Sequence, residues 1–284
     1  MADLDSRLEL AWAVRRSFFP DVITWSYPLD TAVLSLTGTE CALDCAHCGG
    51  HYLSGMRPIW EAKPDGSTSC LISGGCDPTG RVPVMAHHDL VRAWRPGRTM
   101  NWHVGFVSET EMAAIAPLVD VVSFDFVADD ATIHEVYGTD RTVEDYVNSY
   151  QLLRRHARTL PHVTIGLRGG LLGHELRAFE LLQKLGADGL VLLIFVPTPG
   201  TRYADRLPPP PEAAAELLAE ARIRFPGIPL YLGCMRPRGR YRDSLDALAV
   251  RAGMNVIVSP ARGARRLAAD LGLCAREMRE CCVL

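Results

Sequence analysis

The alternation of short strand-like runs with helical stretches constrains this chain more than any other feature of its sequence. Several of these runs are almost continuously apolar, as strands covered on both faces are. Helical patterns separate them, such as 174–184 and Pro211–Arg224, which begins with proline and continues with strong helix formers. Eight strands alternating with helices predict an α/β fold with a parallel sheet, and their number favours a (β/α)8 TIM-type barrel, with a partial barrel as the alternative. The predicted strands are Ala32–Leu36, Cys70–Ser73, Met100–Phe106, Val121–Phe126, His162–Leu167, Leu190–Val196, Pro229–Leu232 and Asn255–Val258.

The length and composition agree with one barrel domain. The 284 residues are 48% hydrophobic, enough to bury a full core. We therefore predict a single domain over 1–284. Within it, 1–30 would be an N-terminal helical extension with an amphipathic helix at Asp3–Arg16, 31–260 the barrel core, and 261–284 a C-terminal helix followed by a cysteine-containing tail.

The charge and hydropathy of the chain argue against nucleic-acid and membrane partners. The formal net charge is −3, and arginines are not interleaved with aromatic residues as in a nucleic-acid-binding stripe. The longest apolar runs, such as Gly189–Val196, are far shorter than the roughly 20 residues of a membrane span. The first ten residues carry acidic charge and lack the apolar core of a secretion signal. We expect a cytoplasmic protein.

Three of the nine cysteines lie close together, directly after the first predicted strand. They form the spacing Cys41-x3-Cys45-x2-Cys48. In a barrel, the loops that follow strands gather at the C-terminal face, where active sites lie. Three thiolates on one loop can bind three irons of a [4Fe–4S] cluster and leave the fourth iron open to a substrate. The spacing therefore predicts a catalytic iron–sulfur site.

Other interpretations of this cysteine triplet are weaker. A zinc site on Cys45 and Cys48 with His47 or His51 would need a second ligand pair, and none is nearby. A ferredoxin-type electron carrier would need a fourth cysteine in the same run. Buried cysteines also cluster by chance, since they pack as small hydrophobic side chains.

A Cys-x3-Cys-x2-Cys loop after the first strand of a β/α barrel resembles the radical S-adenosylmethionine superfamily. The resemblance implies that S-adenosylmethionine binds the open iron and that an electron from a reducing donor splits it into a 5′-deoxyadenosyl radical. The residue before the last cysteine is often aromatic in this family. Here it is His47, which is planar and could contact the adenine.

The resemblance also implies cofactor contacts on later strands. Gly74 and Gly75 follow the second strand, where the family places a glycine turn against the methionine end of the cofactor. The family commonly has glutamate after these glycines, while this chain has Cys76 followed by Asp77, which could accept from the ammonium group. A plain strand-to-helix turn is the alternative.

Three polar residues on the fourth and fifth strands complete the predicted cofactor site. Ser123 and Asp125 share one face of their strand, where the family holds the ribose. The alternative for Asp125 is pairing with a structural arginine. Arg168, beside glycines at a strand end, could bind a carboxylate of cofactor or substrate. No residue could be assigned as a catalytic acid or base.

The remaining clustered cysteines are Cys234, after the seventh strand, and the terminal pair Cys281 and Cys282. Arg236, beside Cys234, could hold an acidic group. The terminal pair allows three interpretations. It could fold back to join Cys234, and Cys76 as well, in binding a second cluster. It also fits a prenylation box, although no basic stretch adjoins it. The third interpretation is an incidental or redox-active tail.

Within the superfamily, the stretches 36–56 and 232–260 resemble the biotin-synthase-like group, and more narrowly the subunits of two-component lipoyl synthases. That resemblance implies sulfur insertion into an octanoyl precursor, either a small molecule or bound to a lipoyl domain, with a second radical enzyme as partner. The chain departs from single-chain lipoyl synthase, which has extra cysteines before the triplet, and from biotin synthase, which has ligands on middle strands. The alternatives are a rearrangement, cyclisation or methylation without sulfur transfer, and a non-catalytic iron–sulfur scaffold.

Overall fold

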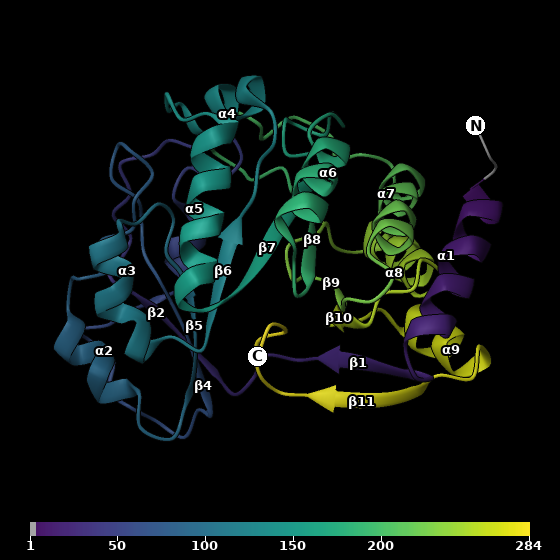
Figure 1. Ribbon diagram of the computed structural model, residues 1–284, viewed down its shortest axis with the longest axis horizontal. Coiled ribbons are helices and arrows are strands. Elements are labelled where there is room, and N and C mark those ends of the chain that lie inside the picture. The colour runs from purple at the N-terminus through teal and green to yellow at the C-terminus, as the bar shows by residue number, and fades with distance from the viewer. Residues whose placement is uncertain (1–3) are drawn as a thin grey trace.

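The computed structural model describes residues 4–284 and is built on one curled parallel sheet (Figure 1). The order of the strands is β11-β1-β10-β9-β8-β7-β6-β5-β4-β2-β3, and each pair of neighbours is parallel. Its strands are β1 (Val22–Ser26), β2 (Thr31–Ser35), β3 (Arg57–Pro58), β4 (Ser69–Ser73), β5 (Thr99–His103), β6 (Val121–Asp125), β7 (Arg158–Ile165), β8 (Leu190–Ile194), β9 (Leu230–Leu232), β10 (Val256–Val258) and β11 (Cys274–Met278).

The helices lie between the strands and cover the outside of the sheet (Figure 1). The helix α7 has the predicted bounds, and the five residues of β8 are all buried, as expected of a continuous apolar run between the barrel interior and the helices. The helices are α1 (Leu4–Phe18), α2 (His88–Trp94), α3 (Glu109–Ile115), α4 (Asp130–Tyr137), α5 (Val143–His156), α6 (Glu175–Leu185), α7 (Pro211–Arg224), α8 (Arg240–Arg251) and α9 (Arg262–Asp270), with 3-10 turns η1 (His51–Gly55) and η2 (Ala116–Leu118).

The eight predicted strands are present as β2 and β4 to β10, but the preference for a closed barrel was wrong. Within residues 4–284 the edge strands β3 and β11 do not pair with each other, so the sheet is a half-barrel. The N-terminal extension is not only helical, because β1 pairs with β10 inside the sheet. The predicted first helix extends to Phe18, and its residue Asp3 lies outside the described residues.

The C-terminal segment also contains an unpredicted strand. β11 has the sequence CAREM and is largely exposed, so it has none of the apolar pattern by which a strand is recognised. Its position is set by backbone pairing with β1, from Val22 opposite Cys274 to Ser26 opposite Met278. After β11 the chain turns back, and the C-terminus lies near the tip of β1 (Figure 1).

The last residues enter the inside of the half-barrel. Val283 is 1% exposed and packs in a small apolar cluster separate from the main core. Cys281, Cys282 and Leu284 pack against the same cluster. The strand residues that form it are Val121, Leu160, Val191, Leu193, Tyr231 and Val256, most of them at or next to the start of their strands.

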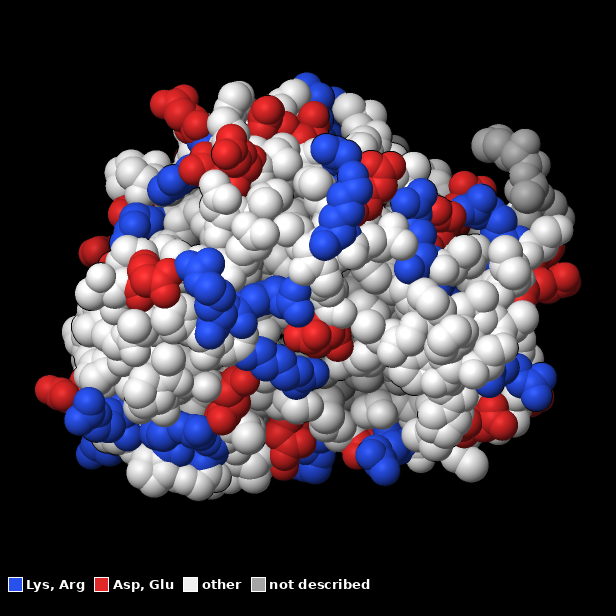
Figure 2. All heavy atoms as spheres, in the orientation of Figure 1, with Lys and Arg blue, Asp and Glu red and all other residues white. Residues whose placement is uncertain are grey.

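The surface is of mixed charge. On the face shown in Figure 2, basic and acidic side chains are interspersed. Within the described chain, charged side chains form ion pairs such as Arg95 with Asp120 and Arg155 with Glu109. Between residues 4 and 284, no helix combines the length and the apolar character needed to cross a membrane.

Candidate active site

The loop between β2 and η1 carries Cys41, Cys45 and Cys48 and is fixed by its neighbours. The N–H groups of Cys48 and Gly49 both donate to the carbonyl of Cys45, each at 3.0 Å. The buried Ala46 donates to the carbonyl of Val136 at 2.7 Å, and its own carbonyl accepts from Tyr203 at 2.9 Å. The loop is therefore anchored to α4 and to the segment after β8.

The turn after β4 packs directly on the cysteine loop. The N–H of Cys76 donates to the sulfur of Cys41 at 3.3 Å, and the N–H of Ala42 donates to the carbonyl of Cys76 at 2.7 Å. A Cβ atom on Gly75 would lie 1.9 Å from the carbonyl oxygen of Glu40, so only glycine fits there. The structure thus brings together the predicted cysteine triplet and the predicted glycine turn.

The thiols of this site are shielded and close to one another. Burial raises the pKa of Cys45, and the neighbouring Cys48, Cys41 and Cys76 raise it further. Burial and Cys41 raise the pKa of Cys76 to about 12. Thiolates crowded in this way need the positive charge of a metal to persist at neutral pH. The donor set therefore fits a metal cluster rather than free nucleophilic cysteines.

The described chain gives no support to a single-ion zinc site on Cys45 and Cys48. Across the described chain, no three side chains among histidine, cysteine, aspartate and glutamate converge tightly enough to hold one metal ion. In an iron–sulfur cluster each thiolate binds a different iron, so the ligands lie farther apart than around one zinc ion. The zinc interpretation of Cys45 and Cys48 therefore has no support in the geometry.

A cavity of about 570 Å³ opens beside Cys41 and is of a size that small cofactors occupy. Asp77 lies on its wall. One carboxylate oxygen of Asp77 already accepts from the N–H groups of Thr79 and Arg81, at 2.8 and 3.0 Å, and therefore stabilises the local turn. Its predicted contact with a cofactor stays a prediction. The remaining residues around this cavity are Thr37, Glu40, Ala42, Gly75, Cys76, Arg81, Val82, Pro83 and Glu111.

His47 lies within the cysteine loop and packs edge-on against Tyr137, with 6.0 Å between the ring centres. Its Nδ1 atom is shielded from water and has no hydrogen-bond partner within residues 4–284. Burial lowers the pKa of His47 to about 4, so the ring is neutral at pH 7. A neutral planar ring with an unsatisfied nitrogen is compatible with the predicted adenine contact.

Two of the predicted cofactor-binding residues, Arg168 and Ser123, form hydrogen bonds with other side chains of the protein. The guanidinium of Arg168 pairs with Glu135 at 2.6 Å, and Glu135 also accepts from the hydroxyl of Tyr203 at 2.6 Å. Arg168 therefore ties α4 to the loops after β7 and β8. The hydroxyl of Ser123 is buried and donates to the side-chain oxygen of Asn101 at 2.9 Å. Each side chain thus already has a protein partner, and the predicted cofactor contacts of Arg168 and Ser123 stay predictions.

Asp125 lies at the end of β6 beside His162 in the strand register. Burial lowers the pKa of His162 to about 3 and that of its ring neighbour His103 to about 4, which leaves both neutral at pH 7. Asp125 forms no ion pair among the described residues, so the alternative of a structural arginine partner is wrong. Asp125 is exposed as a residue at the end of β6, but partial loss of water around its carboxyl raises the pKa of that group to about 6.

Asp125→Asn is expected to stabilise the protein more at about pH 8 than at about pH 4. As the pH rises, the Asp125 carboxyl loses its proton at a lower pH in the unfolded chain than in the folded protein, because its pKa is raised in the folded state. The folding stability of the wild type therefore falls between about pH 4 and pH 6. Asparagine does not titrate and avoids this loss, although the exposure of Asp125 to water makes the loss smaller. The measurement is the difference in melting temperature between variant and wild type at both pH values, with Ser123→Ala as an uncharged control. A difference independent of pH would contradict the argument.

Cys281 and Cys282 of the predicted second cysteine group pack inside the half-barrel, and Cys234 lies near them. Cys234 is exposed as a residue, but loss of water around its thiol, followed by the nearby Cys281, raises its pKa. Cys282 donates its S–H to Cys281, which lowers the pKa of Cys281 to about 7 and raises that of Cys282, and the nearby Cys234 raises it further. Met235 packs in the same cluster. The terminal pair thus lies inside the half-barrel close to Cys234, whereas Cys76 belongs to the first cysteine group.

Arg236 holds an acidic group, as predicted, but that group is Asp246 of the protein itself. Its guanidinium is fully buried and binds both carboxylate oxygens of Asp246, at 2.7 and 2.9 Å. It also donates to the carbonyls of Gly233 and Val258, each at 2.7 Å. Arg236 therefore fixes the chain next to Cys234 and cannot receive a ligand.

Two further residues near the cysteines were not predicted. Asn101 donates to the sulfur of Cys281 at 3.5 Å. Tyr52 shares a hydrogen bond with Thr198 at 3.3 Å. Burial raises the pKa of Tyr52, and the nearby Cys48 and Cys234 raise it further. Asn101 and His103 alternate along β5, a pattern that could have placed both on the inner face. Nothing in the local sequence points to Tyr52.

Known structures share this fold at low sequence identity. No protein-family model matches the sequence, and no curated protein matches it. Methylornithine synthase (PylB) superposes with a TM-score of 0.70 at 14% identity, over 96% of this chain and 89% of that one. The hydrogenase maturase HydG from Carboxydothermus hydrogenoformans gives 0.68 at 12%, over 95% and 72%.

A third similar structure is SuiB from Streptococcus suis, which was solved bound to S-adenosylmethionine. Its TM-score is 0.53 at 11% identity, over 89% of this chain and 61% of that one. Similarities at this level of identity establish the fold, a partial α/β barrel with its loops gathered at one end, and leave the chemistry to the residues of the site.

Proposed function

We propose that this protein is a radical S-adenosylmethionine enzyme. The single observation that carries the proposal is the packing of the Gly74–Gly75 turn on the Cys41–Cys48 loop, with the N–H of Cys76 directed at the sulfur of Cys41. A cysteine triplet, a glycine turn and a cavity of about 570 Å³ meet at the ends of adjacent parallel strands. The similarity to SuiB, a structure that holds S-adenosylmethionine, supports the same assignment.

The residues of the chain would have distinct tasks in this reaction. When bound, the cluster and S-adenosylmethionine would supply an electron and a 5′-deoxyadenosyl radical. Cys41, Cys45 and Cys48 would hold three irons, and the N–H of Cys76 would stabilise the negative charge on one ligand sulfur. The neutral His47 would contact the adenine, and Asp125 would accept a hydrogen bond from the ribose.

The proposal is tested by incubating reduced, reconstituted protein with S-adenosylmethionine and measuring 5′-deoxyadenosine. We expect product from the wild type and none from the Cys41→Ala/Cys45→Ala/Cys48→Ala variant. Cys274→Ala, which changes an exposed cysteine on β11, is the matched control and should behave as wild type. An intact cluster without any 5′-deoxyadenosine would favour a non-catalytic scaffold.

As the reaction we propose sulfur insertion at an unactivated C–H bond of an octanoyl precursor, with a second radical enzyme as partner. The support is the position of Cys281 and Cys282, which pack inside the half-barrel with Cys234 close by; the three would bind a second cluster that supplies sulfur. We expect about eight irons per chain in the wild type and about four after Cys281→Ala/Cys282→Ala. About four irons in both would remove the basis for sulfur insertion.

A rearrangement without sulfur transfer is the second candidate function. It is favoured by the similarity to PylB, a methylornithine synthase, over almost the whole chain. The two candidates differ in the fate of sulfur, since only insertion consumes a cluster sulfide. Product formation that persists in Cys281→Ala/Cys282→Ala would favour the rearrangement.

A further inference from the structure

The path of the C-terminal tail, residues 279–284, shows how two distant parts of the sheet are held together. The tail leaves β11 at one edge of the sheet and reaches the start of β2, near the opposite edge. It then turns inward, so that Val283 packs among the inner apolar side chains. The two sheet edges do not pair with each other in the described chain, so the tail spans the region between them.

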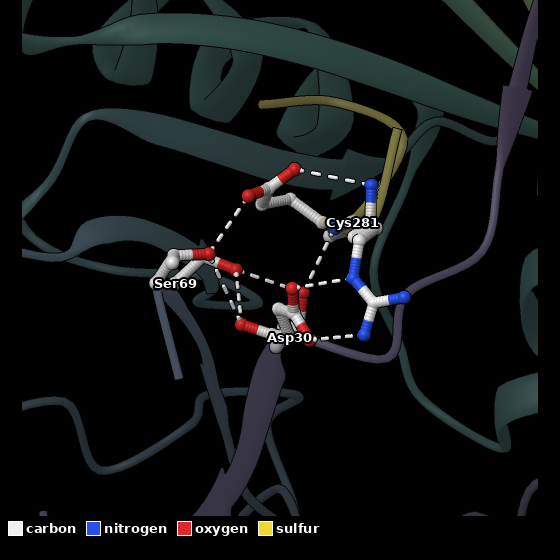
Figure 3. A network of polar contacts seen from close by, with 7 residues as sticks. Asp30, Ser69 and Cys281 are labelled. Atoms are coloured by element: carbon white, nitrogen blue, oxygen red, sulfur yellow. Dashed lines mark hydrogen bonds and ion pairs between the residues drawn. The ribbon is translucent and has the colours of Figure 1, made fainter. Parts of the chain in front are cut away.

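A set of hydrogen bonds fixes this path, and the residues that provide its core, which we call the tail clasp, are Ser26, Asp30, Thr31 and Ser69. Figure 3 shows Asp30 and Ser69 of the clasp close to Cys281. Asp30 binds the guanidinium of Arg279 through both oxygens, at 2.7 and 2.9 Å. The N–H of Asp30 also donates to the carbonyl of Arg279 at 2.9 Å. The first residue of the tail is thus held by side chain and backbone together.

The clasp continues to the cysteine pair. Ser26 donates to the carbonyl of Glu280 at 3.0 Å, and the hydroxyl of Thr31 accepts from the N–H of Cys281 at 2.8 Å. Ser69, which is fully buried, lies 2.8 Å from the same hydroxyl and fixes its direction. Because the bond to Thr31 is made by the backbone of Cys281 itself, the clasp determines where this cysteine enters the barrel.

The tail has hydrogen-bond partners outside the clasp, but their bonds are long or lie farther from the sulfur atoms of Cys281 and Cys282. Asn101 donates to the sulfur of Cys281 at 3.5 Å, a long contact. Arg158 donates to the carbonyl of Val283 at 3.1 Å. Thr68 donates to the carboxylate of Glu280 at 2.7 Å, and Val283 is buried. None of these contacts holds the backbone N–H of Cys281, so loss of the Thr31 bond would let this residue open locally.

From this arrangement we infer that Thr31 and Asp30 are positioning residues, which keep Cys281 and Cys282 beside Cys234 and so complete the second cysteine group. The inference rests on the proposed function only for the cluster that this group would bind. The clasp itself is defined by protein atoms alone. The ion pair of Asp30 with Arg279 is partly exposed and contributes little energy by itself, so the bond between Thr31 and Cys281 carries most of the effect.

The test compares Thr31→Val, which keeps the shape but removes the hydroxyl, with Thr31→Ser, which keeps the hydroxyl. In the full-length, metal-free chain, alkylation of Cys281 and Cys282 is followed by peptide mass spectrometry, with the exposed Cys274 as internal reference. We expect Thr31→Val to react roughly five- to tenfold faster, the factor that one lost buried hydrogen bond gives to a local opening. Thr31→Ser should react at the wild-type rate.

A second readout is iron after anaerobic reconstitution. Thr31→Val should fall from about eight irons to about four, with the cluster on Cys41, Cys45 and Cys48 retained. Should Thr31→Val fail to fold, Arg279→Gln removes the exposed partner of Asp30 and should accelerate alkylation by a smaller factor, about two- to threefold, because that ion pair contributes little. Unchanged alkylation in Thr31→Val, or in Arg279→Gln where Thr31→Val does not fold, would overturn the inference. About four irons in the wild type would instead refute the second cluster, while the alkylation result still decides the clasp.

Discussion

Gly75→Ala is expected to abolish iron binding at the cysteine triplet while leaving most of the fold in place. A methyl group at this position would lie 1.9 Å from the carbonyl oxygen of Glu40 and 2.7 Å from both Cα and Cβ of Cys41. The first of these neighbours is backbone and cannot move aside as a flexible side chain does. The cysteine loop must therefore shift, and the bond from the N–H of Cys76 to the sulfur of Cys41 is lost with it.

Two quantities are measured for Gly75→Ala: iron per chain after anaerobic reconstitution, and the formation of 5′-deoxyadenosine. We expect the formation of 5′-deoxyadenosine to fall at least about a hundredfold, because errors near 1 Å in the placement of reacting groups have effects of this order. Gly55→Ala is the matched control, since a methyl group at Gly55 meets nothing within 4 Å. Circular dichroism separates local displacement from unfolding. A Gly75→Ala protein with wild-type iron would show that the two loops are not in the contact described here.

The strands that form the site could be predicted because each carries its own pattern. β8 is apolar along its whole length, and α7 begins at a proline and continues with helix-forming residues, so local sequence was sufficient. β11 could not be found in this way, because it is polar and exposed and exists only through its pairing with β1. The opening of the barrel was also hidden, since closure depends on the tilt and stagger of strands rather than on residue type.

For the site, the ligands could be predicted but the partners of charged residues could not. The spacing of Cys41, Cys45 and Cys48 and the glycines after β4 are local features, and the structure brings them together. Arg168 and Arg236 were expected to bind ligands, but each is paired with a carboxylate that lies on a helix. Which acid meets which arginine is decided by tertiary packing, which no local pattern encodes.

Asp246→Ala is expected to lower the free energy of unfolding by about 3–5 kcal/mol, because it leaves the buried guanidinium of Arg236 without a counter-charge. Both side chains of this pair are 0% exposed. Asp246 also accepts from the N–H of Ala261 at 2.9 Å, so its loss leaves a second buried donor unsatisfied. Chemical denaturation at neutral pH measures the change.

The control for Asp246→Ala is Glu180→Ala, which breaks the exposed pair of Glu180 with Arg177 and should cost less than about 1 kcal/mol. Equal losses in the two variants would contradict the burial argument. Arg236 holds the carbonyl of Gly233, next to Cys234, so the same substitution should loosen the cysteine on which the proposed second cluster depends. On heating, we therefore expect Asp246→Ala to lose iron from the proposed second cluster while the cluster on Cys41, Cys45 and Cys48 is still bound. The loop that carries these three cysteines is anchored on α4 and on the turn after β4, away from the ion pair of Arg236 and Asp246.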